Sequence, residues 1–70
     1  MHANTRFRFQ FKGDKYMLVD RATGNVLRWS IKVDMYQLLH DYFYFDEDMS
    51  KEAARKAAAN AYDQINGEVA

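Results

Sequence analysis

The side chains best suited to chemistry in this chain are cations, and they alternate with phenylalanine near its start. Arg6, Arg8 and Lys12 follow this pattern in TRFRFQFKGDKYM, residues 5–17. Guanidinium and ammonium groups bind carboxylates and phosphates. In a strand, successive side chains point to opposite faces of the sheet, so the two arginines would share one face and the phenylalanines the other. The pattern therefore favours recognition of an anion.

Side chains that hold metals are sparse. The chain has no cysteine and two histidines. The stretch DEDMSKE places Asp46, Asp48 and Ser50 at positions one, three and five of a calcium loop. Lys51 then stands where glycine is required, and Ala57 stands where the bidentate glutamate should be. We expect no metal site.

Catalytic arrangements are equally weak. His40 and Asp41 are neighbours on a predicted helix and point about 100° apart, so they cannot form a dyad. No serine has the setting of a nucleophile, and no glycine-rich loop could hold a phosphate. We therefore expect a protein that is not an enzyme, with no catalytic residues, no cofactor and no small-molecule substrate.

The cations are positioned by three predicted strands. Residues Thr5–Lys12, Lys15–Asp20 and Val26–Ile31 are rich in aromatic and β-branched side chains. Gly13 occupies the first central position of a two-residue type II′ turn, and Gly24 ends a four-residue connection where a left-handed residue is needed. These signals predict a three-stranded antiparallel meander in the order 1-2-3.

The even lengths of both loops predict which residues lie opposite one another. One face, the core, would carry the rows Phe7–Asp20–Asn25, Phe9–Leu18–Leu27 and Phe11–Tyr16–Trp29. The other face would carry Arg8–Val19–Val26, Gln10–Met17–Arg28 and Lys12–Lys15–Ser30, with Arg6 and Lys32 at its ends. Every sheet aromatic would then lie on the core face, and the opposite face would be basic with an apolar centre.

Two helices are predicted after the strands. From Val33 a helical period places Met35, Leu38, Leu39, Tyr42 and Phe45 in one stripe. Ser50 can cap a second helix that has Glu52 in its first turn and ends at Gly67. That helix would bury an alanine-rich stripe against Tyr36 and Phe43, namely Ala53, Ala54, Ala57, Ala58, Ala61 and Ile65.

The predicted fold is therefore of the α+β class, with the element order β-β-β-α-α and the helices packed on the Phe/Trp face of the sheet. Seventy residues form one small domain, residues 1–70, and we expect residues 1–4 and 68–70 to be frayed. No signal-peptide core opens the sequence, and no apolar run approaches the roughly 20 residues that span a bilayer. We expect a cytoplasmic protein with no membrane partner.

The charges are distributed unevenly although the net charge is zero. Residues 1–33 carry about +5 and residues 34–70 about −5. This asymmetry indicates either an anionic partner for the first half or charge-matched packing between the two halves. Both interpretations stay open at the level of sequence.

The predicted function is that of a small binding module. Its candidate contacts with a macromolecule are the residues of the basic face: Arg6, Arg8, Lys12, Lys15, Met17, Val19, Arg28 and Lys32. Duplex nucleic acid is the simplest anionic partner, because a sheet can lie against phosphates while arginines reach base edges. In layout, three strands backed by a helix, the chain resembles AP2-type and integrase N-terminal DNA-binding domains, although it has two helices after the sheet. A basic face without aromatics disfavours stacking with single strands.

An acidic protein surface is the alternative partner. Met17, Val19 and Val26 would form an apolar centre with an arginine rim, as in small protein interfaces. Small domains of this kind often act as accessory subunits or inhibitors, and phages and mobile elements encode many. The charged face could also serve only to stay solvated and prevent aggregation.

A second interface is predicted on the first helix. His40 and Tyr44 lie opposite its core stripe, where they would either anchor a partner or be covered by the alanine-rich helix. Homodimerisation is a further alternative, through this surface or through the free edge strand Thr5–Lys12.

Overall fold

A computed structural model describes residues 6–32 and 34–69 of the chain. The elements are β1 (Phe7–Lys12), β2 (Lys15–Asp20), β3 (Val26–Ser30), α1 (Met35–Asp41), the π-helical turn η1 (Tyr42–Asp46) and α2 (Lys51–Val69). The three strands form one antiparallel sheet in the order β1-β2-β3. The α+β class and the β-β-β-α-α order are therefore confirmed. The fraying predicted for residues 1–4 and for residue 70 lies outside the described residues, whereas residues 68 and 69, also predicted to be frayed, belong to α2.

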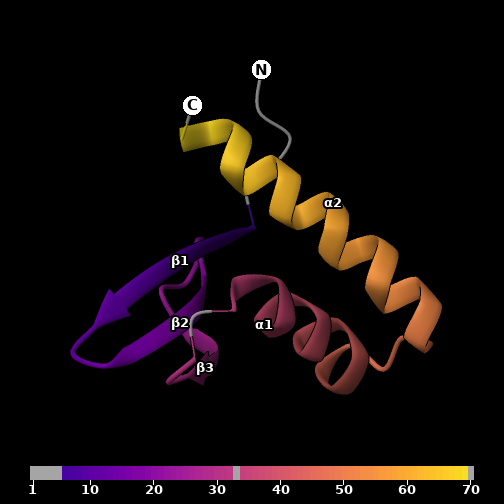
Figure 1. The fold of residues 1–70 in the computed structure, drawn as a ribbon, viewed down its shortest axis with the longest axis horizontal. Coiled ribbons are helices and arrows are strands. Elements are labelled where there is room, and N and C mark those ends of the chain that lie inside the picture. The colour runs from indigo at the N-terminus through magenta and orange to yellow at the C-terminus, as the bar shows by residue number, and fades with distance from the viewer. Residues whose placement is uncertain (1–5, 33, 70) are drawn as a thin grey trace.

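The helices cover one face of the sheet (Figure 1). α1 contacts β2 and β3, whereas α2 packs along α1 and reaches β1. Leu18 and Leu39 are fully buried where the sheet meets α1. The rest of the core cluster comes from all the layers: Phe7, Leu38, Phe43, Ala54, Ala58, Ala61 and Ile65. No helix in the described part of the chain is long and apolar enough to cross a membrane.

The first hairpin follows the predicted register. All six pairs between β1 and β2 agree, from Phe7 opposite Asp20 to Lys12 opposite Lys15. Gly13 has a φ of 65°, and the next residue does not have a positive φ, as a type II′ turn requires. Gly24 has a φ of 79°, which confirms the left-handed residue of the second connection.

The second hairpin departs from the predicted register. The backbone N–H of Asp20 donates to Asn25 at 2.9 Å, and Val19 lies opposite Val26, as predicted. A bulge then intervenes, so that Leu18 lies opposite Arg28. The next two rows become Met17–Trp29 and Tyr16–Ser30. The prediction that Leu18 faces Leu27 and Tyr16 faces Trp29 is therefore wrong.

The bulge has a physical reason in the extent of the helical layer. The regular register would place Trp29 in the row of Phe11 and Tyr16, and Phe11 in that row is still 59% exposed. Tryptophan would gain little burial there. The extra residue instead turns Arg28 toward the helices, where its guanidinium lies 3.2 Å from the carboxylate of Asp46. The predicted placement of every sheet aromatic on the core face is thus wrong for Trp29.

The first helical stripe changes at η1. Leu38, Leu39 and Phe43 are buried, but Phe45 is 63% exposed. The backbone N–H of Glu47 donates to the carbonyl of Tyr42, five residues earlier, which is the bond of a π-helical turn. This wider turn rotates the following residues, so Phe45 leaves the core stripe in which it was predicted.

α2 begins as predicted and ends later. Ser50 accepts a hydrogen bond from the backbone N–H of Ala53 at 3.2 Å, which confirms the cap. Asp48 before it has a φ of 58°, so the chain reverses there at the end of η1. The helix continues past Gly67 to Val69, although glycine costs about 1 kcal/mol relative to alanine in a helix, so the predicted end at Gly67 is wrong. Ala53 was predicted to be buried but is exposed, because it lies beside the contact stripe.

The packing of α1 on α2 can be tested with two alanines of the same helix. Ala58 is fully buried, whereas Ala53 is exposed. We expect Ala58→Leu to lower the free energy of unfolding by about 1–3 kcal/mol, because the larger side chain overpacks the helix contact. Ala53→Leu, the matched control, should change it by about 0.5 kcal/mol or less in urea unfolding. Equal effects of the two substitutions would contradict this helix packing.

Candidate binding face of the sheet

The outer face is the side of the sheet that the helices leave uncovered. The pairings of β1, β2 and β3 place eight side chains on it: Arg8, Gln10, Lys12, Lys15, Met17, Val19, Val26 and Trp29. Five of these were predicted as binding residues, namely Arg8, Lys12, Lys15, Met17 and Val19. The bulge brings Trp29 to this face and removes Arg28 from it.

Trp29 is the aromatic centre of the outer face. Its side chain is 56% exposed, and it lies opposite Met17. The ammonium of Lys15 sits 4.6 Å from the ring centroid, in cation–π geometry. Lys12 lies directly opposite Lys15 in the hairpin, but the ammonium of Lys15 lies over the Trp29 ring. The outer face therefore combines a flat aromatic ring with positive charge.

Val19 forms the apolar floor of the same face. It is only 1% exposed, yet it does not belong to the core cluster beneath the helices. Arg8 lies opposite Val19 on β1 and donates a hydrogen bond of 2.7 Å to Gln10. Val26 lies opposite it on β3 and is 48% exposed. A buried valine with a half-exposed valine and a tryptophan nearby makes the centre of this face apolar.

Arg28 is occupied by the helical layer. Besides its ion pair with Asp46, its guanidinium lies 5.5 Å from the ring centroid of Phe45. Both partners belong to η1. Arg28 was predicted on the basic face, and the structure places it on the opposite side of β3. Its predicted contact with a macromolecule remains a prediction that this geometry does not favour.

Arg6 is also turned toward the helices. Its guanidinium forms an ion pair with Glu47 and donates to the hydroxyl of Tyr42 at 3.0 Å. It lies over the ring of Phe7, with 4.8 Å to the centroid. Lys32 follows the end of β3 and is exposed, and its backbone N–H donates to the hydroxyl of Ser30 at 3.0 Å.

These ion pairs explain part of the charge asymmetry. Arg6–Glu47 and Arg28–Asp46 each join the basic first half of the chain to the acidic second half. Charge-matched packing between the halves is therefore present. Arg8, Lys12 and Lys15 remain on the outer face, and none of them has an acidic partner among the described residues.

His40 and Tyr44 lie together on the helical side of the molecule. Their rings stack with 6.0 Å between centroids and 15° between planes. The Nδ1 atom of His40 is buried and makes no hydrogen bond to the described residues, and the carboxylate of Asp41 lies 3.6 Å away. Tyr44 is partly exposed. Their use as a second interface stays a prediction.

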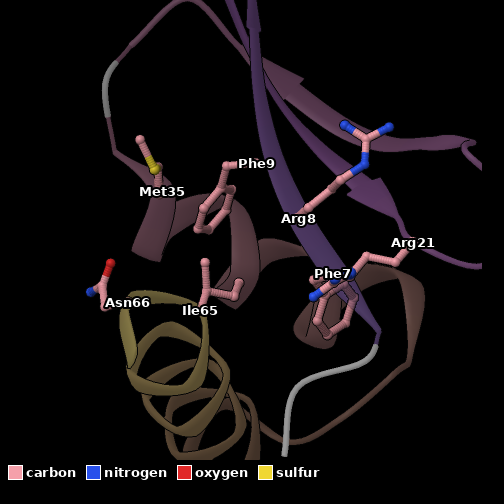
Figure 2. Close-up of a pocket in the computed structure, with 7 residues that line it drawn as sticks. All are labelled: Phe7, Arg8, Phe9, Arg21, Met35, Ile65 and Asn66. Carbon is pink, nitrogen blue, oxygen red and sulfur yellow. The ribbon is translucent and has the colours of Figure 1, made fainter. Parts of the chain in front are cut away.

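An apolar groove of about 400 Å³ lies between β1 and the end of α2. Figure 2 shows Phe9, Met35 and Ile65 gathered at this groove, while Arg8 points away from Ile65 on the other side of β1. The remaining lining residues are Phe7, Arg21 and Asn66. Among the residues that the structure describes, no carboxylate, imidazole or nucleophilic side chain lines this groove.

Metal-binding groups are also dispersed. Within residues 6–32 and 34–69, no group of three or more His, Cys, Asp or Glu side chains lies close enough to hold an ion. The outer face brings cations and an exposed aromatic ring together, and it is the candidate binding surface. Comparison of the chain with protein-family models, curated proteins and solved structures found no match.

Sequence reasoning missed the role of Trp29. The alternation in VLRWSIK and the even length of the loop between β2 and β3 both favour a regular register. No residue type in β3 indicates that the strand contains a bulge. The acidic pair Asp46 and Glu47 was the available clue. It lies between the two helices and could attract an arginine from each outer strand of the sheet.

The position of Trp29 can be tested by fluorescence, because the chain has one tryptophan. We expect acrylamide to quench the native protein nearly as efficiently as the urea-unfolded protein, since more than half of the side chain is exposed. Lys15→Gln should increase the quenching further by removing the ammonium above the ring. Strong protection of the native tryptophan would contradict the exposed position of Trp29 on the outer face.

Proposed function

We propose that this protein is a non-enzymatic interaction module that docks the outer face of its sheet on an acidic surface of another protein. The observation that carries this proposal is that the exposed ring of Trp29 shares the outer face with Arg8, Lys12 and Lys15, which lack acidic partners among the described residues. Tryptophan and arginine are the residues most enriched in the energetic centres of protein interfaces. Such centres are apolar and carry a polar rim.

The outer face has this arrangement. Trp29, Met17 and Val26 form an apolar strip over β2 and β3, and Val19 lies beneath it. Arg8 and Lys12 flank the strip on β1. A partner with acidic side chains around an apolar residue would match both parts, and charge complementarity would speed association.

Duplex nucleic acid is less favoured than the sequence suggested. Arg6 and Arg28, two of the six predicted cations, bind Glu47 and Asp46 instead of facing outward. Affinity for a duplex grows with the number of phosphates that are neutralised. The cations left on the outer face would give few such contacts, and the acidic second half of the chain would repel a long duplex.

Single-stranded nucleic acid is the second candidate, and the Lys15–Trp29 pair favours it. A base can stack on an exposed tryptophan while a neighbouring ammonium contacts phosphate. A single exposed ring gives one stacking position, whereas the apolar strip has no use in phosphate binding. The protein partner therefore accounts for more of the outer face.

The proposal predicts a site-specific crosslink to a protein. We expect Val26→p-benzoylphenylalanine, placed on the outer face, to crosslink to a protein in a nuclease-treated lysate of the native host. The same photoreactive residue at Ala53, exposed on α2, is the matched control and should give no such product. Arg8→Glu/Lys12→Glu should abolish the product at position 26 by repelling an acidic partner, as judged by mass spectrometry.

A charge control separates this face from general electrostatics. Lys51→Glu/Lys56→Glu changes the charge equally on exposed positions of α2 and should leave the crosslink intact. Circular dichroism should be the same for all variants, because exposed substitutions cost about 0.5 kcal/mol or less. Crosslinks found only to nucleic acid before nuclease treatment would favour the single-strand candidate. No product at position 26 under either condition would contradict both.

A further inference from the structure

The two edge strands of the sheet differ in the charge of the side chains that they place on the outer face. β1 and β3 are the edge strands, and an edge strand presents unpaired backbone N–H and C=O groups. β1 carries Arg8 and Lys12 and is contacted by α2. Charges on an edge strand discourage pairing with another strand. Contact with a helix does not distinguish the two edges, because α1 contacts β3 as α2 contacts β1. At the other edge, Figure 1 shows no described element beyond β3.

The edge at β3 is also apolar. Val26 and Trp29 are half-exposed, and Ile31 just after the strand is 65% exposed. A hollow of about 390 Å³ lies between β3 and α1, with Arg28, Trp29 and Ser30 on the strand side, although the two elements are in contact elsewhere. An open apolar edge of this kind normally pairs with another strand or leads to aggregation.

We propose that β3 pairs antiparallel with β3 of a second copy, which joins the two sheets into one of six strands. The bulge confines the regular part of this edge to the residues after Leu27. Antiparallel pairing about a two-fold axis keeps both outer faces on one side of the joined sheet when one residue lies opposite its own copy. Within the regular part of β3, this residue is Arg28, Trp29 or Ser30.

Charge selects one of these three registers. An axis at Arg28 places Arg28 opposite itself, and an axis at Ser30 places Arg28 opposite Lys32 of the second copy. Both oppose like charges, which destabilises a strand pair. An axis at Trp29 avoids this conflict, because it places the two Trp29 rings opposite each other and Arg28 opposite Ser30. It also brings Leu27 opposite the exposed Ile31.

The dimer would enlarge the outer face without covering it. Paired tryptophans would lie at the centre of the joined sheet, with the cations of each copy on either side. This inference is independent of the proposed function, because it concerns the purified chain alone. It also differs from the edge Thr5–Lys12 considered from the sequence, whose charges disfavour pairing.

A cysteine crosslinking experiment tests both the dimer and its register. The chain has no cysteine, so each variant contains one thiol. Residues directly opposite have Cβ atoms about 4.5–5.5 Å apart, close to the range for a disulfide. We expect Trp29→Cys to form an intermolecular disulfide at least about tenfold faster than Val26→Cys under mild oxidation, because a preformed contact raises the effective thiol concentration. Val26 is similarly exposed, but this register sets the two copies of residue 26 far apart.

A second measurement keeps the test valid if the cysteine substitution itself weakens the dimer. Sedimentation velocity of the wild-type protein should show a monomer–dimer equilibrium between about 1 µM and 1 mM. Ile31→Lys should shift it to monomer, whereas Phe11→Lys, a substitution of similar exposure on β1, should not. A wild-type monomer throughout this range, or equal crosslinking at positions 26 and 29, would overturn the proposal.

Discussion

One extra residue in β3 determines which side chains lie on the outer face of the sheet. The bulge lies between the Val19–Val26 and Leu18–Arg28 pairs. After it, each side chain of β3 points to the face opposite the one that a regular ladder would give, because the side-chain period of a strand is two. Arg28 therefore reaches the helices and Trp29 reaches the outer face. The exposed tryptophan exists because of this single irregularity.

The bulge and the helical layer support each other through charge. Asp46 is the last residue of η1 and Glu47 follows it, and each pairs with an arginine from a different edge of the sheet. Arg6, just before β1, and Arg28, in the middle of β3, thus join the two edges of the sheet to the segment between α1 and α2. Pairs this exposed contribute about 1 kcal/mol or less each. Their main effect is to hold Arg6 and Arg28 on the helical side of the sheet. The cations on the outer face are then Arg8, Lys12 and Lys15.

Local sequence signals predicted the parts of the fold that depend on neighbouring residues. Gly13 determines the first turn, and with it the full β1–β2 register. Ser50 marks the start of α2 because a cap acts within one turn. The bulge could not be predicted in this way, since it reflects where the helical layer ends over the sheet. The π-helical turn that exposes Phe45 is likewise a consequence of tertiary packing.

The sequence predicted the cations of the candidate site, but it did not predict the tryptophan at its centre. Lys12 and Lys15 lie on the outer face because the first hairpin is regular. Trp29 was assigned to the core, which led to the expectation that no aromatic could stack on the basic face. Reversal of this one side chain changes the favoured partner from duplex nucleic acid to an acidic protein surface with an apolar centre.

Nuclear magnetic resonance of the wild-type protein would test the bulge most directly. Cross-strand nuclear Overhauser effects between the backbone protons of β2 and β3 report which residues lie opposite each other. The bulged register predicts contacts from Trp29 to Met17 and from Arg28 to Leu18. Contacts from Trp29 to Tyr16 and from Arg28 to Met17 would instead show a regular ladder, which would return the tryptophan to the core face and contradict the binding face described for this protein.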